Sequence, residues 1–443
     1  MSLKGRLSRL GPNAPLSAEE RRARQRLQEP SVAPTSAPAP PPWPPVQVLD
    51  ELRARMAAML ERSPPPPRPT HEQSIAELPF VRVDTEYGPL TQRLCVLAPS
   101  HHVGRIPVES ARTVSAALLS LLALDPRISD VSPERALYLD TETTGLGGAG
   151  TLAFLVGLAW FNTDGRLVLE QLLLASPAEE LALIEHVRAR LDACSVIVSF
   201  NGKSFDLPLL QARAVMSACP RLPEKPHLDL LHVGRRLHKA RLGSCRLIHL
   251  ETEVLGWERG ADDIAGADIA PLYGHFLRTG DGEVLRAVVE HNAWDVVTMA
   301  ALVGLYGEPV GLLHPADLLG VAETARRHRA YDQARAFADA SLERGVGHSA
   351  LYVRAQIEKA RGDKARALLD FELLSQEVDD PAVRLELVKL YEHHAKDFET
   401  ALRVLGQGVL EDEAAIEKRR LRLEQKTEKK PPQPRAPHAR RRR

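Results

Sequence analysis

The middle of the chain combines short apolar runs with amphipathic segments. Phe80–Ile106 alternates apolar and polar residues in short runs typical of strands. Four further runs predict strands, at Ala136–Leu139, Leu152–Phe161, Leu167–Ala175 and Ser195–Phe200. Helical periodicity predicts four helices, at Ser110–Leu124, Pro177–Ala193, Ser204–Ala218 and Gly282–Tyr306. This order of elements predicts an α/β fold with a mixed sheet flanked by helices.

Strand signals end near Leu313, and the chain beyond this point is predicted to be helical. Three similar segments contain Ala334, Ala365 and Ala401, which recur at roughly the 34-residue period of tetratricopeptide repeats. Small residues at these positions would let paired helices approach closely. The sequence therefore predicts a tetratricopeptide-like all-α domain, with a plain helical bundle as the alternative.

Composition at the two ends of the chain sets the outer domain boundaries. Proline runs near Pro38–Pro45 and at Pro64–Pro67 favour extended linkers that cannot build a core. The last residues are rich in lysine and arginine. We expect five parts: a disordered proline-rich arm (1–70), an extension packing on the α/β domain (71–134), the α/β domain (135–308), the helical domain (309–416) and a basic disordered tail (417–443).

Charge and cysteine content bear on the compartment and on the partners. The chain has 58 Lys and Arg and 58 Asp and Glu, so net charge argues neither for nor against a nucleic-acid partner. The four scattered cysteines form no zinc-knuckle pair and no disulfide framework, which fits a reducing compartment. The N-terminus lacks the apolar core of a signal peptide, and no apolar stretch reaches the roughly 20 residues of a membrane helix. We expect a cytoplasmic protein that does not bind membranes.

The first candidate motif is Asp140-Thr-Glu142-Thr-Thr-Gly-Leu146, directly after a predicted buried strand. Residues two apart in a strand face the same side, so the carboxylates of Asp140 and Glu142 project together. Two such carboxylates repel each other and lose hydration unless a cation offsets both charges. Divalent metal ions prefer oxygen ligands and would serve this purpose.

Two further motifs carry candidate ligands. Asp206 follows the Asn201-Gly turn and falls in the first turn of a predicted helix, where it is either a helix-capping acid or a functional residue. His291 and Asp295 are four residues apart in the last helix of the α/β domain and therefore share one helix face. Four carboxylates and one histidine fit a site for two-metal phosphodiester hydrolysis, with histidine accepting the proton of the attacking water.

The three motifs resemble those of the DEDD 3′–5′ exonucleases of the ribonuclease H-like superfamily. Four segments are more closely similar to the YprB-like ribonuclease H-like family, namely Ser199–Leu210, Ser244–Glu251, Asp262–Ile269 and His291–Val296. The resemblance covers about Phe80 to Tyr306. It implies a ribonuclease H-like fold and divalent-metal-dependent hydrolysis of nucleic acid from the 3′ end.

The resemblance also implies roles for individual residues. The metal ligands would be Asp140, Glu142, Asp206 and Asp295, holding two divalent cations, Mg²⁺ or Mn²⁺, and His291 would be the general base. Thr143 and Leu146 would border the terminal nucleotide, and Asn201 and Phe205 would shape the pocket, although core packing is the simpler role for Phe205. One feature departs from the family: three residues separate the histidine from the last aspartate, a spacing typical of members with tyrosine.

Several features stay open at the level of sequence. The basic segment Gly234–Arg246 either contacts phosphates or is a solvated helix face, and Asp229 either assists the site or caps a turn. The predicted activity is a 3′–5′ exonuclease acting on DNA or RNA, with a possible protein partner for the helical repeats. The alternative is a catalytically silent scaffold that binds nucleic acid or protein.

Overall fold

A computed structural model describes residues 78–145, 150–260 and 263–429 of the chain. The predicted arm (1–70), Leu146 and the last residues of the predicted tail (430–443) lie outside the described residues. Within the described part, no helix combines the length and apolar character needed to cross a bilayer.

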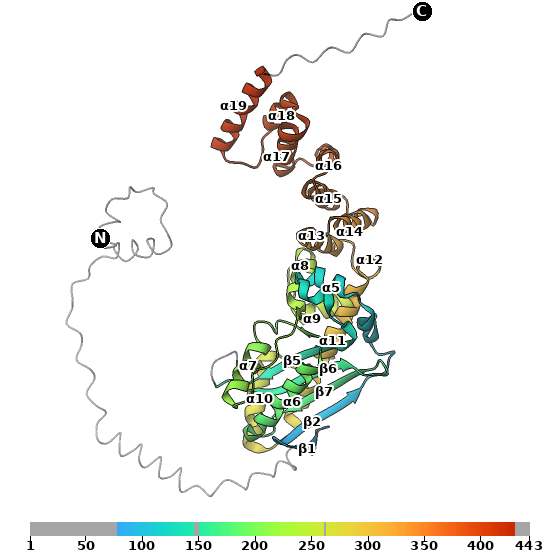
Figure 1. Ribbon diagram of the computed structural model, residues 1–443, viewed down its shortest axis with the longest axis vertical. Coiled ribbons are helices and arrows are strands. Elements are labelled where there is room, and N and C mark those ends of the chain that lie inside the picture. The colour runs from blue at the N-terminus through green and yellow to red at the C-terminus, as the bar shows by residue number, and fades with distance from the viewer. Residues whose placement is uncertain (1–77, 146–149, 261–262, 430–443) are drawn as a thin grey trace, which may run out of the picture. The chain divides into compact units, whose positions relative to one another are not determined.

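A seven-stranded mixed sheet organises the first part of the described chain (Figure 1). Its strands, in spatial order, are β1 (Val81–Thr85), β2 (Gly88–Val96), β7 (Leu167–Leu173), β6 (Ala153–Phe161), β5 (Ala136–Thr143), β8 (Val196–Ser199) and β9 (His227–Asp229). Neighbours from β1 to β5 are antiparallel, whereas β8 runs parallel to both β5 and β9. The mixed sheet predicted from the sequence is therefore confirmed. The predicted extension does more than pack against the sheet, because β1 and β2 are two of its strands.

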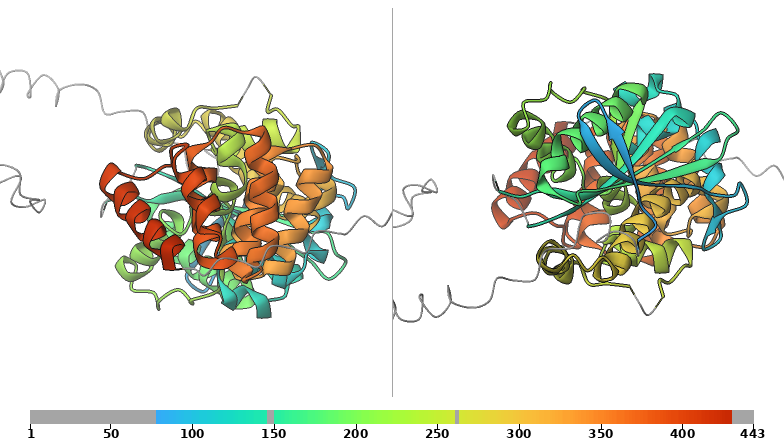
Figure 2. Two further views of the ribbon diagram at one scale, coloured as in Figure 1. Left: turned by 90° about the horizontal axis from the view of Figure 1, so that it is seen from above. Right: turned by 90° about the horizontal axis from the view of Figure 1, so that it is seen from below.

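Helices lie on both sides of this sheet (Figure 2). They are α5 (Ala116–Ala123), α6 (Glu180–Ala193), α7 (Asp206–Met216), α8 (Leu230–Leu242), α9 (Leu247–Leu250), α10 (Gly266–Thr279) and α11 (Arg286–Gly307). Short 3₁₀ segments occur at Val108–Thr113, Pro126–Asp130, Pro133–Arg135, Pro177–Glu179 and Glu283–Leu285, and a π-helical turn at Glu251–Leu255. A separate two-stranded ribbon pairs β3 (His102–Val103) with β4 (Ile106–Pro107).

The central strand β5 is buried on both faces, which explains its continuous apolar run. Ala136 and Tyr138 belong to the core cluster that contains the C-terminal half of α11. Leu137 and Leu139 belong to the second cluster, together with residues of α6 and α7. The same alternation of side chains continues beyond Leu139. The side chains of Asp140 and Glu142 therefore lie on the side of the sheet that faces α11.

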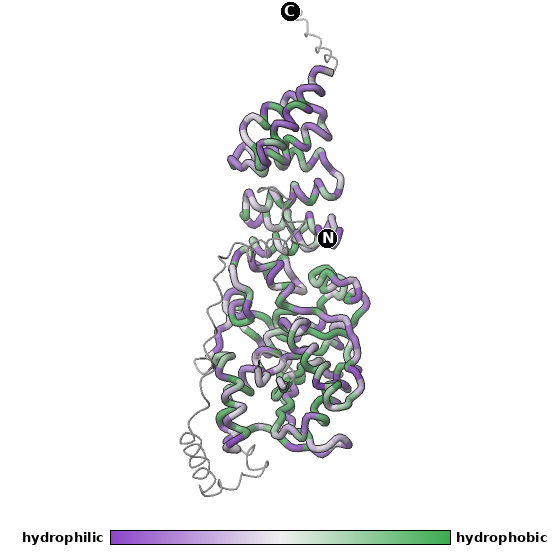
Figure 3. Tube along the Cα trace, turned by 90° about the vertical axis from the view of Figure 1, so that its left-hand side faces the viewer, coloured by the Kyte–Doolittle hydropathy of each residue, from purple (hydrophilic) through white to green (hydrophobic). Residues whose placement is uncertain are grey.

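Beyond α11 the described chain is helical. The helices are α12 (Pro309–Leu312), α13 (Asp317–Arg327), α14 (Tyr331–Glu343), α15 (His348–Arg361), α16 (Lys364–Glu377), α17 (Pro381–Leu390), α18 (Phe398–Leu405) and α19 (Glu413–Lys429), with a π-helical turn at Tyr391–Ala395. Apolar and polar positions alternate along them, as expected for amphipathic helices that pack on their neighbours (Figure 3). The tetratricopeptide assignment itself stays a prediction.

Small residues lie where these helices pack, as the sequence predicted for two of the three recurring alanines but not for the third. Ala334 and Ala401 are completely buried, as the close approach of helices requires. Ala365 is exposed, and the buried alanine of this helix is Ala367. The reason is the helix start: Asp363 is the N-cap of α16, so the fourth residue after the cap faces the core, as Ala334 and Ala401 do in α14 and α18.

The predicted start of a disordered tail at residue 417 is wrong, because α19 continues to Lys429. Leu423 is completely buried in the core cluster of the last helices. Arg422 and Lys426 both bind the carboxylate of Glu392, at 2.7 and 2.8 Å. Arg422 and Lys426, two of the basic residues that suggested a tail, therefore belong to a packed helix.

Candidate active site

Asp140 and Glu142 lie where β5 emerges from the core. Asp140 pairs with Gly157 of β6, and Glu142 pairs with Leu155. Both carboxylates are half-buried and face α11, as strand alternation predicts. The Oδ2 atom of Asp140 accepts a hydrogen bond of 2.9 Å from Nδ2 of Asn292 on that helix.

Asn292 is a site residue that the sequence reasoning missed. It is completely buried, and its Oδ1 accepts a 2.9 Å hydrogen bond from Nε2 of Gln171. This bond fixes the amide so that its Nδ2 points to Asp140. A Cβ atom at residue 157 would lie 2.4 Å from Asn292 Oδ1, so glycine at this position allows α11 to approach the sheet. The sequence offered one signal for Asn292, because this polar amide lies between the candidate residues His291 and Asp295 in a helix that is largely apolar.

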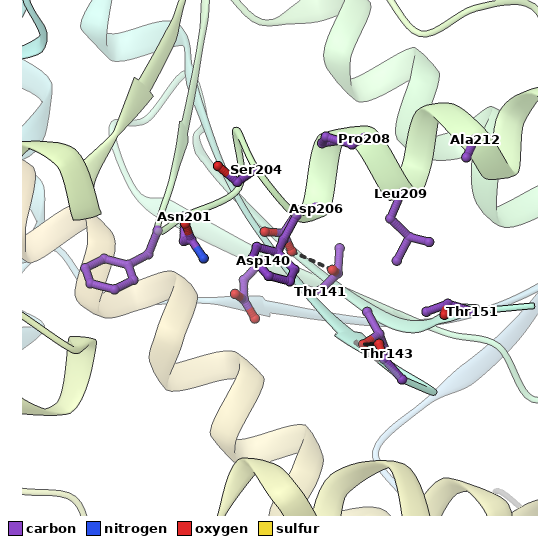
Figure 4. Close-up of a pocket in the computed structure, with 13 residues that line it drawn as sticks. Asp140, Thr141, Thr143, Thr151, Asn201, Ser204, Asp206, Pro208, Leu209 and Ala212 are labelled. Atoms are coloured by element: carbon purple, nitrogen blue, oxygen red, sulfur yellow. Dashed lines mark hydrogen bonds between the residues drawn. The ribbon is translucent and has the colours of Figure 1, made fainter. Parts of the chain in front are cut away.

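Asp206 is the first residue of α7 and reaches β5 from the opposite side. Its Oδ1 accepts a 2.5 Å hydrogen bond from Oγ1 of Thr141, the residue between the two β5 carboxylates (Figure 4). Figure 4 shows the carboxylates of Asp140 and Asp206 close together beside an open cavity. The second motif therefore meets the first, although the two are far apart in sequence.

The role of Asp229, left open by the sequence, is to hold the turn before Asp206. Its carboxylate caps α8 by accepting from the backbone N–H of Leu231 at 3.1 Å. It also accepts from the N–H groups of Asn201 and Lys203, at 2.9 and 3.2 Å. Asn201 has φ of 71°, a left-handed conformation in which asparagine is more frequent than most residues.

The third motif meets the first at Glu142. Ligand atoms of Glu142, His291 and Asp295 all lie within 4.8 Å of one another. His291 Nε2 is 3.8 Å from Asp295 Oδ2, so the two residues share a helix face as their spacing predicts. The imidazole thus reaches the carboxylates despite the departure from the usual family spacing.

Asp263 is a second residue that the sequence reasoning missed. Its Oδ1 lies 2.7 Å from Nδ1 of His291. The guanidinium of Arg259 is also 3.2 Å from this nitrogen, but a guanidinium only donates. A carboxylate accepts, so the contact with Asp263 requires the Nδ1–H tautomer, and in this tautomer the lone pair is on Nε2.

Arg259 is the third missed residue and provides the positive charge of the cluster. Its side chain is only 5% exposed and donates to both oxygens of Glu251, at 2.6 and 2.7 Å. The same guanidinium donates to Asp295. Glu251 is completely buried and also accepts from Thr298 Oγ1 at 2.9 Å. Arg259 therefore ties the segment after α9 to α11.

One arginine does not neutralise the four carboxylates. Burial, together with the negative charge of Asp295, raises the pKa of Glu142 to about 7. Burial raises the pKa of Asp206 to about 6 despite the hydrogen bond from Thr141. Burial and the charges of Asp295, Glu142 and Asp206 raise the pKa of Asp140 well above its usual range. An oxygen-rich cluster with excess negative charge fits divalent cations.

This electrostatic balance predicts how pH and metal change stability. Because the pKa values of Glu142 and Asp206 are raised on folding, the folded protein holds protons that the unfolded chain releases. Without metal, the contribution of these two groups to the stability of the fold is most favourable below about pH 4. This contribution is lost as the pH rises through about 6 to 7. Excess Mn²⁺, at about 100 times its dissociation constant, would add about 2.7 kcal/mol.

The measurement is a series of melting temperatures between pH 5 and pH 8, with Mn²⁺ or with chelator. We expect a deficit in chelator that grows with pH, and a smaller deficit in the Glu142→Gln variant, which carries no charge at this position. Equal melting temperatures with Mn²⁺ and chelator at pH 8 would show that the cluster binds no metal.

A cavity of about 600 Å³ opens beside the acids. Thr143, Asn201 and Phe205, three of the predicted substrate-contacting residues, line it together with Asp140 and Asp206. Phe205 is 52% exposed, so the expectation that it packs in the core is wrong. Phe205 directly precedes α7 and lines the cavity, whereas the next residue, Asp206, is buried.

Comparison with known proteins indicates the family of the chain. Residues 137–306 match the RNase H superfamily. The chain is also 33% identical over 304 residues to YprB of Bacillus subtilis (strain 168), covering 63% of this chain and 70% of that protein. The chain belongs to the same family as YprB, and its residues 137–306 form an RNase H-like domain. The matched residues of this RNase H-like domain run from β5 to α11 and include Asp140, Glu142, Asp206, His291 and Asp295.

Proposed function

We propose that the chain is a divalent-metal-dependent nuclease that removes nucleotides from the 3′ end of nucleic acid. The observation that supports this proposal is that Asp140, Glu142, Asp206 and Asp295 lie within electrostatic reach of one another, and that Asp140 and Asp206 line an open cavity. The RNase H-like domain supports a nuclease, and the three motifs favour the 3′–5′ exonuclease type.

Asp140, Glu142, Asp206 and Asp295 would hold the two cations, Mg²⁺ or Mn²⁺. Metal bound there would polarise a water and would stabilise the departing 3′ oxygen. Asn292 orients Asp140, and Thr141 orients Asp206, so both carboxylates are fixed before substrate binds. Arg259 holds Asp295 in the same way.

His291 is the proposed general base. Asp263 binds its Nδ1–H, so Nε2 is the nitrogen that accepts the proton of the attacking water. The cavity would take the terminal nucleotide, with Thr143 and Asn201 at its border. The exposed ring of Phe205 offers a surface on which a base stacks.

The test is hydrolysis of a 5′-labelled oligonucleotide in Mn²⁺, with DNA and RNA strands compared side by side. We expect a ladder of products that shortens from the 3′ end, and no cleavage of a closed circular strand. Asp206→Asn should abolish the ladder, whereas Asp164→Asn, the same change in an exposed hairpin turn, should not. Cleavage of the closed circular strand would contradict the proposed exonuclease activity. A wild-type protein that cleaves neither DNA nor RNA would contradict the proposed nuclease activity.

A further inference from the structure

A second, basic groove adjoins the cavity of the active site. It has a volume of about 460 Å³ and lies between α8 and the turn that precedes α9. Three exposed cations line it, Arg235 and Lys239 from α8 and Arg246 from the turn. We refer to this feature as the α8 groove. It contains the basic segment whose role the sequence left open.

The cations of the α8 groove differ from the other arginines of the same helix. Arg241 makes a two-point ion pair with Asp317, at 2.6 and 2.9 Å, and Arg236 donates to the backbone carbonyl of Leu122. Among the described residues, no carboxylate lies within 4.0 Å of Arg235, Lys239 or Arg246. Three like charges gathered without a counter-ion favour an anionic ligand with several charges.

The α8 groove is continuous with the active site through two residues. Phe200 and Asn201 line both the groove and the cavity that contains Asp140 and Asp206. The carboxylate of Asp229 binds the N–H of Asn201 and caps α8. The cations of α8 are therefore carried by a helix that is tied directly to the turn before the catalytic aspartate.

We propose that the α8 groove binds the sugar–phosphate backbone of the substrate strand on the 5′ side of the terminal nucleotide. This inference rests on the proposed function, which puts the terminal nucleotide in the adjoining cavity. The remaining strand must leave that cavity, and the route past Asn201 meets Arg235, Lys239 and Arg246. Contacts of arginine and lysine with phosphates hold a strand irrespective of its sequence.

The test is the salt dependence of binding of a fluorescent single-stranded oligonucleotide, measured by anisotropy in chelator so that no hydrolysis occurs. Each phosphate contact on a single strand contributes about −0.7 to the slope of log K against log salt. We expect Arg235→Ala/Lys239→Ala to reduce the steepness of the slope by about 1.4 and to weaken binding about 10-fold to 100-fold at 50 mM salt.

A matched control removes two cations elsewhere. Arg403 and Lys418 are exposed residues of α18 and α19, and Arg403→Ala/Lys418→Ala should leave the slope unchanged. Arg235→Lys/Lys239→Arg keeps both charges and should retain the wild-type slope, which separates charge from loss of folding. Equal slopes for the groove and control variants, or no binding by the wild type, would overturn the groove. An inactive wild type in Mn²⁺ would instead contradict the nuclease, because the binding assay needs no catalysis.

Discussion

Asp140→Asn is expected to lower the rate of hydrolysis by about a thousandfold, which corresponds to about 4 kcal/mol of transition-state stabilisation. Asp140 faces Asn292 and is within electrostatic reach of Glu142, Asp206 and Asp295, so its charge is central to the proposed metal site. An asparagine has the same shape and still offers an oxygen to Asn292, but it does not contribute the negative charge. Single-turnover rates on a labelled oligonucleotide in Mn²⁺ provide the measurement.

The same substitution should raise stability when metal is absent. Burial and neighbouring acids raise the pKa of Asp140 well above its usual range, so its charge destabilises the folded state. Removing that charge should increase the melting temperature in chelator. Asp164→Asn, in an exposed turn, should change neither rate nor stability. A variant that is both active and no more stable than the wild type would contradict the charge cluster.

Arg259→Ala should lower the free energy of unfolding by about 3–5 kcal/mol, the cost of leaving a buried charge without its partner. The Arg259 side chain is 5% exposed and its partner Glu251 is completely buried. Alanine leaves the Glu251 carboxylate with Thr298 as its remaining side-chain donor among the described residues. Calorimetric unfolding in chelator provides the measurement.

A second substitution separates the ion pair from general loss of packing. Adding Glu251→Gln to Arg259→Ala should recover part of the lost stability, because a neutral amide is less costly to bury than a lone carboxylate. Arg221→Ala removes an exposed arginine and should leave stability unchanged. An Arg259→Ala variant as stable as the wild type would show that the pair with Glu251 does not hold this part of the fold.

The sequence predicted which way four of the five candidate side chains project, because these four lie in segments with a regular period. The alternation of β5 set the side to which Asp140 and Glu142 project, and the helical period set His291 and Asp295 on one face. The mixed sheet was predicted from the order of strands and helices, which were themselves recognised by their periods. Local periodicity therefore predicted both the fold and four of the five central side chains.

Residues in segments without a period were not predicted. Arg259 and Asp263 follow α9 in an irregular segment, and their contacts with α11 depend on how that segment folds over the helix. Asn292 lies in a predicted helix, but its contact with Asp140 depends on the close approach of α11 to Gly157, which no local pattern reveals. The tail was misassigned because the charges of α19 pair with Glu392, a contact that no local pattern reveals.

The central claim is that acids from three distant segments form one site for divalent cations. Anomalous diffraction from crystals grown with Mn²⁺ tests it most directly. We expect Mn²⁺ peaks within about 2–2.5 Å of carboxylate oxygens of Asp140 together with Asp206 or Asp295. A map in which Mn²⁺ lies elsewhere, with the carboxylate of Asp206 turned away from Asp140 into solvent, would contradict the account.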